Sequence, residues 1–539
     1  MPTLSFSHVS FAWPDGRRVF DDLTTSVPDG FSALVGRNGI GKSTLLRLAL
    51  GELTPTAGTI ASTGHLAYVP QDLSLGVDAR VIDVWGVAPR VEALRAIEAG
   101  SGDPAHYEAL GDDWGVEDRA LAVLRDLGLE VGLDRTVGHV SGGEAVLLGV
   151  GAALLADPDL LILDEPTNNL DAEARAALRS SLASRRGATL VVTHDRGMLE
   201  TVDRIGELRE RDDRTADLHW YGGALGEFES ARAAEGEAAA RAVATAASAV
   251  ARRGRELNAH VTAAGRRSRQ GEKARAQRRV VGLAADAAKN RAERTDARVR
   301  AIHEQRLASE RERLDQARAA LPRDRSIRID LPATAVPSRR LVAEAAGLVT
   351  RTGAELDALV RGPERIHVAG GNGAGKTTLV ATMLGEVAPA SGRASVAVAA
   401  GVLRQRLDVL DPSLSVIDNV RRRAPEASPQ DVRDSLGRFQ FRGATAGAPV
   451  GTLSGGERFR AALACVLLAR PVPQLLVLDE PTNSLDLDSQ ARLLEALADF
   501  QGALMVISHD PAFVDALRPT RRWTVAGEGG PVADEPLAG

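Results

Sequence analysis

The chain has 539 residues, about three to four times the length of a usual single domain, so we expect at least two large domains. Hydrophobic residues make up 44% and charged residues 26%, with a net charge of -6, which is typical of globular proteins and excludes a disordered or membrane-embedded composition. The one cysteine, Cys465, excludes an intramolecular disulfide framework, a four-cysteine zinc site and a cysteine-ligated iron–sulfur cluster.

No apolar run reaches the length of a transmembrane helix, roughly 18 residues. The longest, Ala145 to Ala156, has 12 residues and includes two glycines. The opening sequence MPTLSFSHVSF has neither a basic nor a strongly apolar region, so we expect no secretion signal. Together with the single cysteine, these features predict a cytoplasmic protein.

The first predicted domain, residues 1–224, contains GRNGIGKST from Gly36 to Thr44, which fits the phosphate-binding pattern G-x-x-x-x-G-K-[ST]. The apolar run FSALVG precedes it and TLLRLAL follows, so we expect a buried strand, a glycine-rich loop and a helix. Four further motifs follow in order: YVPQ ending at Gln71, SGGE starting at Ser141, LLILDEPTNNLD ending at Asp171, and THD containing His194.

The second predicted domain, residues 333–539, repeats this series. It contains GGNGAGKTT from Gly370 to Thr378, VLRQ ending at Gln405, SGGE starting at Ser454, LLVLDEPTNSLD ending at Asp486, and SHD containing His509. The spacing between matched motifs is 334 residues for the lysines Lys42 and Lys376, and 313 residues for the SGGE motifs. The halves are therefore duplicates, and the first carries 21 extra residues, which we place around residues 92–118.

Apolar runs such as LLILD and LLVLD predict fully buried parallel strands in both halves. Because these runs alternate with helical patterns, we expect each half to be an α/β domain with helices on both faces of its sheet.

The segment between the domains, residues 225–332, is predicted to be a basic helical linker. Residues 251–300 hold 15 Lys and Arg against 5 Asp and Glu, and no proline occurs from Leu225 to Leu321. We expect a hairpin of two helices, the first from Leu225 to Ala264 and about 60 Å long, with the turn near Gly265 and Gly271. Such a charge run favours either a polyanionic partner or a solvated helix pair. The predicted RNA-binding residues are Arg266, Arg267, Arg269, Lys273, Arg275, Arg278 and Arg279.

The motifs predict ATP chemistry with Mg²⁺ as cofactor. Backbone amides of a glycine-rich loop cradle phosphates, a lysine binds the β- and γ-phosphates, and a Ser or Thr hydroxyl binds Mg²⁺. In the first half these residues are Gly36, Asn38, Gly39, Gly41, Lys42, Ser43 and Thr44. In the second half they are Gly370, Asn372, Gly373, Gly375, Lys376, Thr377 and Thr378.

Acidic and histidine residues at strand ends complete the predicted sites. Asp164 and Asp479 are placed to hold the water shell of the metal. Glu165 and Glu480 follow them directly and are the candidates for polarising the attacking water. His194 and His509 follow another strand and are interpreted as γ-phosphate contacts, with a buried structural histidine as the alternative.

With these motifs, the chain resembles the ATP-binding cassette (ABC) ATPases. SGGE resembles their signature motif, Gln71 and Gln405 their Q-loop glutamines, which also approach the metal, and Asn169 to Asp171 and Ser484 to Asp486 their D-loops. Two cassettes in one chain, a basic helical linker and DEPTN in both halves resemble the ABC-F subfamily. Its members bind the ribosome near the E site and act as translation factors or antibiotic-resistance proteins.

The resemblance implies that each nucleotide lies between the P-loop of one half and the signature of the other, so that the protein is a monomer whose two cassettes pair internally. One site would join the first P-loop, Gln71, Asp164, Glu165 and His194 to Ser454, Gly455 and Gly456. The other would join the second P-loop, Gln405, Asp479, Glu480 and His509 to Ser141, Gly142 and Gly143. ATP would close the halves and hydrolysis would release them.

Two departures from the family pattern predict unequal sites. Trp13 suits the aromatic that stacks on adenine, whereas AAGLVTRTG in the second half offers none. SGGEAVLLGV also lacks the basic residues that follow SGGE in the second half, Arg458 and Arg460. Both losses are expected to weaken the site built on the second P-loop. The alternative is that Trp13 belongs to the core and that backbone packing replaces the missing aromatic.

The resemblance implies an ATP hydrolase that binds the ribosome, with 23S rRNA and the P-site tRNA as partners and no integral membrane partner. The short extra segment in the first half favours an antibiotic-resistance protein over a housekeeping factor that regulates elongation. A transporter ATPase subunit and a DNA-repair or chromosome ATPase are the alternatives from other classes. The basic linker disfavours the transporter, and the single cysteine and the linker's length disfavour the last.

Overall fold

The computed structural model describes residues 4–537, with the exception of residues 72, 74, 75, 169, 212, 278–281, 320–331, 405–407, 442, 454, 484 and 528. The chain forms two compact units. One combines Met1–Gly226 with Arg325–Gly539 and the other is Glu227–Asp324. The first unit therefore contains both halves of the repeat, and the second contains the segment between them.

The first half is built on a nine-stranded sheet in the order β4-β1-β2-β9-β8-β3-β7-β6-β5. Its strands β3 (Phe31–Gly36), β7 (Ala188–Val192) and β6 (Leu160–Asp164) pair in parallel and are almost entirely buried, which explains their continuous apolar sequences. The other strands are β1 (Leu4–Ala12), β2 (Arg18–Val27), β4 (Ala57–Ser62), β5 (Leu66–Val69), β8 (Arg204–Glu210) and β9 (Ala216–Gly222). The main helices are α1 (Lys42–Ala49), α6 (Gly142–Leu155), α7 (Ala172–Ser184) and α8 (Arg196–Leu199).

The second half divides the same elements between two sheets. A six-stranded sheet has the order β14-β15-β16-β12-β17-β19, and a four-stranded sheet has the order β13-β10-β11-β18. The strands are β10 (Leu341–Val349), β11 (Ala354–Arg361), β12 (Arg365–Ala369), β13 (Ser391–Val396), β14 (Ala400–Leu403), β15 (Leu475–Asp479), β16 (Ala503–Ile507), β17 (Arg521–Thr524), β18 (Gly530–Pro531) and β19 (Ala533–Pro536). The helices include α11 (Lys376–Met383), α14 (Gly455–Leu467), α15 (Leu487–Ala498) and α16 (Pro511–Leu517). The predicted α/β class is confirmed in both halves.

Motif residues also begin the helices that position the sites. The hydroxyl of Ser141 accepts the amide hydrogen of Glu144, whose carboxylate accepts the amide hydrogen of Ser141, forming a capping box for α6. Asp171 caps α7 by accepting the amide hydrogen of Ala174, and Asp486 caps α15 by accepting that of Ser489. The helix ends are thus determined locally by the sequence.

The extra segment of the first half is helical. It comprises α3 (Ala88–Glu98) and α4 (Pro104–Leu110), after the short α2 (Val81–Val84) and before α5 (Val116–Asp126). The second half passes from α12 (Val416–Arg423) directly to α13 (Pro429–Arg438), which begins 313 residues after α5. The two SGGE motifs are also 313 residues apart, so the two halves match in length from α5 onwards to this motif. The added residues of the first half therefore lie before α5 and after α2.

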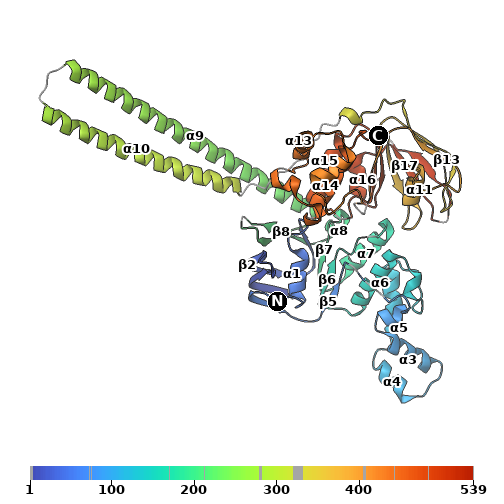
Figure 1. Ribbon diagram of the computed structural model, residues 1–539. Coiled ribbons are helices and arrows are strands. Elements are labelled where there is room, and N and C mark those ends of the chain that lie inside the picture. Colours follow the sequence, from blue (N-terminus) through green and yellow to red (C-terminus); the bar gives the residue numbers. More distant parts are fainter. Residues whose placement is uncertain are drawn as a thin grey trace. The chain divides into compact units, whose positions relative to one another are not determined.

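The linker is a pair of long helices, α9 (Leu225–Gln277) and α10 (Gly282–Ala319), which run antiparallel and side by side (Figure 1). Leu307 and Leu314 on α10 are buried, and the rings of His260 and His303 lie 5.4 Å apart across the pair. Among the described residues, no helix combines the length and apolarity needed to cross a membrane.

The predicted turn near Gly265 and Gly271 is wrong, because α9 continues through both glycines for 53 residues, or about 80 Å. A glycine inside a helix costs about 1 kcal/mol relative to alanine, and the many Ala, Arg and Glu neighbours offset that cost. Arg266, Arg267 and Arg269 are exposed on α9. Lys273 and Arg275 also belong to α9, although the structure does not describe their side chains. Arg278 and Arg279 lie outside the described residues.

Candidate nucleotide sites

Each P-loop joins a buried strand to a helix, as predicted. In the first half it connects β3 to α1, and in the second it connects β12 to α11. Gly41 and Gly375 precede these helices at φ 120° and 94°. A Cβ on Gly41 would lie 2.7 Å from Val19, and one on Gly375 would lie 2.5 Å from the hydroxyl of Thr352. Only glycine therefore allows the loop to turn its amides inward at the helix start.

The two P-loop lysines are buried and have matching contacts. Lys42 Nζ donates to the Gly36 carbonyl at 2.6 Å and lies 3.0 Å from His194 Nε2. Lys376 Nζ donates to the Gly370 carbonyl at 2.9 Å and lies 3.1 Å from His509 Nε2. Burial lowers the pKa of both lysines. Burial and the adjacent lysine lower the pKa of His194 to about 3 and that of His509 to about 4, so both histidines are neutral acceptors.

The acidic residues stand at the ends of buried parallel strands. Asp164 ends β6 and Asp479 ends β15, and Glu165 and Glu480 follow in left-handed backbone conformations at φ 49° and 47°. Such a conformation costs a non-glycine residue on the order of 1 to 3 kcal/mol and concentrates at functional sites. The amide of each glutamate donates to the last residue of the neighbouring strand, Val192 at 2.8 Å or Ile507 at 2.9 Å.

These glutamates face the histidines and are strongly shielded from water. The distance from the glutamate Oε1 to the histidine Nε2 is 3.5 Å in both halves. Burial raises the pKa of Glu165 to about 8 and that of Glu480 to about 7. A carboxylate with a pKa near neutrality is well matched to the task of a general base.

The residues present fit a nucleoside triphosphate with a divalent metal. Both carboxylate oxygens of Glu480 are buried without a hydrogen-bond partner among the described residues, as expected of a group that receives a donor from bound reactants. The hydroxyl of Thr377 donates to Asp479 Oδ2 at 3.1 Å, placing a hydroxyl and a carboxylate together. Mg²⁺, when bound, would neutralise charge on the phosphates. Ser43, Thr377 and Gln71 remain its predicted ligands, and Gln405 lies outside the described residues.

One cavity of about 710 Å³ brings the second P-loop and the first signature motif together. Its lining includes Ser141, Gly142, Gly143, Asn372, Gly373, Gly375, Lys376, Thr377, Thr378, Asp479, Glu480 and His509. The residues that the resemblance assigned to one composite site, apart from Gly370 and Gln405, thus line one space.

Each P-loop also contacts the D-loop of the other half, and the contact is closer at the first P-loop. The Asn38 amide donates to Asp486 Oδ2 at 2.9 Å, whereas the matching distance from Asn372 to Asp171 is 3.5 Å. A Cβ on Gly455 would lie 3.5 Å from Asn38 Nδ2, so the second signature lies beside this loop. Ser454 lies outside the described residues. A Cβ on Gly456, in the first turn of α14, would lie 2.9 Å from the hydroxyl of Ser489 and 3.9 Å from Asp486 Oδ2.

The sequence matches the family described as "ABC transporter" at residues 20–168 and 355–483. It is 35% identical over 527 residues to the tylosin resistance ATP-binding protein TlrC of Streptomyces fradiae, covering 92% of each chain. The chain belongs to the ABC-F subfamily of ATP-binding cassette ATPases. It is also 32% identical to the probable ATP-binding protein YheS of Escherichia coli K12, over 92% of this chain and 74% of that one. The solved structure of an RNase-L inhibitor shares the fold, with a TM-score of 0.59 and 18% identity, covering 100% of this chain and 91% of that one.

As an ABC-F protein, the chain is an ATP hydrolase, and its two cassettes differ in the loop that we predict to stack on the base. Trp13 and Thr350 are exact counterparts: each follows the first strand of its half and donates its amide to the residue four positions on, at 2.9 Å in both. Trp13 packs edge-on against Phe11, with their ring centroids 5.2 Å apart, and the Arg47 guanidinium lies 5.9 Å from its ring. Thr350 is buried and its hydroxyl lies 2.9 Å from that of Thr352, a residue that lines the 710 Å³ cavity.

The basic residues after the second SGGE have structural contacts within their own cassette. Arg458 donates to the Leu453 carbonyl at 3.0 Å, and the buried Arg460 guanidinium lies 5.9 Å from the Phe441 ring. The Arg460 counterpart in the first half is the buried Leu147. The two signatures therefore differ in their packing, and the effect of this difference on ATP binding stays a prediction.

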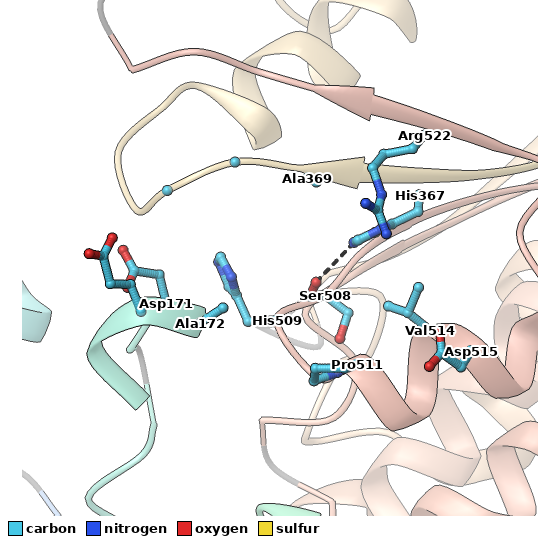
Figure 2. Close-up of a pocket in the computed structure, with 13 residues that line it drawn as sticks. Asp171, Ala172, His367, Ala369, Ser508, His509, Pro511, Val514, Asp515 and Arg522 are labelled. Carbon is cyan, nitrogen blue, oxygen red and sulfur yellow. Dashed lines mark hydrogen bonds between the residues drawn. The ribbon is translucent and has the colours of Figure 1, made fainter. Parts of the chain in front are cut away.

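A second cavity of about 350 Å³ lies behind the second P-loop (Figure 2). Figure 2 shows Asp171 and Ala172 at the start of α7 on one side of His509, with Ser508 and His367 on the other. His367 Nε2 donates to the Ser508 carbonyl at 3.1 Å. Since His509 lines both cavities, the second P-loop has open space on two sides. The first cassette has the buried Ala33 in place of His367, a change that the sequence motifs do not reveal.

Proposed function

We propose that this ABC-F protein binds the ribosome at the E site in its ATP-closed form and confers antibiotic resistance by protecting the ribosome. The observation that carries the proposal is the similarity to the tylosin resistance protein over 92% of both chains. That protein's name states resistance and ATP binding, and the ribosomal site is taken from the ABC-F resemblance. The linker would reach towards the P site and the peptidyl-transferase region.

The charge of the linker supports an RNA partner. Arg266, Arg267 and Arg269 are exposed on one continuous helix, where their guanidinium groups can meet phosphates. Binding of this kind releases counterions and weakens as salt rises. A helix pair can also enter a cleft as a stiff element, which suits contacts to 23S rRNA and the P-site tRNA.

The P-loop contacts support a switch controlled by nucleotide. Asn38 of the first cassette bonds to Asp486 of the second, and the 710 Å³ cavity is lined by both cassettes. A triphosphate bound there would contact both halves only when they are closed, so ATP would favour the closed state and hydrolysis would release it.

The second candidate function is a housekeeping translation factor that regulates elongation. The similarity to YheS over 92% of this chain favours it, because the name of that relative mentions ATP binding and does not mention resistance. Growth of a sensitive host with and without the gene, on macrolides, lincosamides and pleuromutilins, separates the two candidates. Resistance to at least one class supports protection, and unchanged susceptibility with altered elongation supports the housekeeping role.

Ribosome binding is tested by sedimentation of the Glu165→Gln, Glu480→Gln double variant in ATP or ADP. We expect the variant to accumulate on ribosomes in ATP and to dissociate in ADP. Sedimentation with membranes instead would contradict the proposal and favour a transporter subunit.

The role of the linker is tested by neutralising Arg266, Arg267 and Arg269 together to Gln. Each lost phosphate contact should reduce the slope of log affinity against log salt by roughly 0.7 to 0.9. Ribosome-free ATPase should be unchanged. The matched control replaces Arg306, Arg311 and Arg313 with Gln. These residues are exposed on α10, so the control removes the same amount of positive charge from a different part of the linker. Equal effects of the two triple variants would show that the arginines act only through net charge.

A further inference from the structure

Arg175 is a buried cation on α7 of the first cassette. Its side chain is 8% exposed, and its guanidinium makes three contacts. Nε donates to the Leu170 carbonyl at 3.0 Å and Nη1 lies 3.3 Å from Asp195 Oδ2, both in the first cassette. Nη2 donates to Asn483 Oδ1 of the second cassette at 3.4 Å. The planar guanidinium therefore connects Leu170 of the D-loop and Asp195 in the first cassette with Asn483 in the second.

Asn483 belongs to the turn that carries Glu480. The Asn483 amide donates to the Glu480 carbonyl at 3.5 Å, closing the turn immediately after the glutamate. A side chain that fixes Asn483 from outside thus also fixes the backbone of Glu480. This matters because Glu480 holds a left-handed conformation that its surroundings must maintain.

The opposite site lacks this connection. The counterpart of Arg175 is Gln490 on α15, whose Nε2 donates to the Leu485 carbonyl at 3.3 Å, just as Arg175 donates to Leu170. Gln490 has no hydrogen bond to Asn168, the counterpart of Asn483, among the described residues, although both line the same small cavity. Among the described residues, the charged, fork-shaped contact across the cassettes therefore serves the turn of Glu480 and not that of Glu165.

We propose that Arg175 is a positioning residue for hydrolysis at the second site, acting across the cassettes through Asn483 on Glu480. The charged groups that face Glu480 are Lys376 from α11, Asp479 from β15, and Arg175 from α7, with the neutral His509 after β16. Of these groups, Arg175 comes from the other cassette. Turnover at the second site thereby depends on the first cassette's D-loop through the turn of Glu480, whereas the first site meets the second D-loop through the P-loop contact of Asn38 with Asp486.

The proposal rests on the ATPase activity and is independent of the ribosome. The test measures steady-state ATPase of the full chain with one site silenced, using Glu165→Gln to isolate the second site and Glu480→Gln to isolate the first. Asn483→Ala removes the acceptor while Arg175 keeps its contacts to Leu170 and Asp195. We expect kcat of the second site to fall by at least about fivefold with KM for ATP within about twofold, because the loss concerns positioning and not binding.

Asn168→Ala is the matched control, since it makes the same change in the turn of Glu165. We expect kcat of the first site to stay within about twofold of its parent. Equal losses from Asn168→Ala and Asn483→Ala would overturn the proposal, because both turns would then need their asparagine for a reason other than Arg175.

The exchange variant Arg175→Gln, Gln490→Arg moves the charged contact to the other turn. We expect the second site to lose turnover as it does in Asn483→Ala, and the first site to gain relative to Arg175→Gln alone. Thermal unfolding and ATP binding of the exchange variant are measured alongside its turnover. If the exchange variant is found to fold poorly, the result for Asn483→Ala decides the question. Second-site kcat within about twofold of the parent in both Asn483→Ala and the exchange variant would refute the positioning role.

Discussion

The two candidate nucleotide sites of this ABC-F ATPase share one geometry around the P-loop lysine and differ at their edges. The lysine-to-histidine distances are 3.0 and 3.1 Å, and the glutamate-to-histidine distance is 3.5 Å in both halves. Around this centre, the first cassette places Trp13 where the second has Thr350, and, among the described residues, it is the second site that receives a buried arginine from the other cassette. The two halves therefore share the arrangement of lysine, histidine and glutamate and differ in the residues around it, to which we assign base stacking and control of turnover as predictions.

The most severe test of the shared centre is the Glu165→Gln, Glu480→Gln double variant. Loss of a general base costs typically 10²- to 10⁴-fold in rate, so we expect hydrolysis to fall to near background. ATP binding should persist because the P-loops and lysines are intact. The measurement is phosphate release alongside equilibrium nucleotide binding. Turnover near that of the unmodified protein would show that these glutamates are not the bases.

The difference between Trp13 and Thr350 can be tested by changing each residue in turn. Trp13→Ala should weaken ATP binding at the first site by roughly 1 to 3 kcal/mol if the ring stacks on the base. Thr350→Trp in the second cassette should strengthen binding there, since it restores a stacking surface in an equivalent loop. Nucleotide titration with Lys376→Ala or Lys42→Ala present assigns each effect to one site. An unchanged affinity in Trp13→Ala would mean that the ring belongs to the core.

The smallest expected difference is in the pH dependence of the two sites. A base must be ionised to accept a proton, so turnover at each site should rise as pH passes the pKa of its glutamate. Burial raises that pKa to about 8 for Glu165 and to about 7 for Glu480, where Arg175 opposes the rise. The second site should therefore reach half of its maximal kcat at a lower pH than the first. Superimposable pH profiles of the single-site variants would contradict this order.

The sequence alone determined the parts of the molecule that depend on local pattern. The runs LLILD and LLVLD predict buried parallel strands because strands covered on both faces need continuous apolar residues, and both are parallel and buried. The P-loops were predictable because glycine spacing is required by backbone geometry next to a helix start, as at Gly41 and Gly375.

The linker shows where local signals mislead. Gly265 and Gly271 suggest a turn, yet α9 continues through both to Gln277. The local cost of each glycine, about 1 kcal/mol, is smaller than what neighbouring helix formers and packing against α10 supply. The position of the turn was therefore decided by the whole hairpin.

The sequence already predicted unequal sites, but the contact between Arg175 and Asn483 became visible only in the tertiary structure. Arg175 and Asn483 are 308 residues apart, and nothing around either residue in the sequence indicates that they meet. Likewise, Thr350 is recognisable as the counterpart of Trp13 only through the matching hydrogen bonds of the two hairpin loops. Motifs can be recognised in a sequence because phosphate chemistry requires certain residues at a fixed spacing. Contacts between the cassettes depend instead on how two folded surfaces meet. The residues that make such contacts therefore have no fixed spacing along the chain.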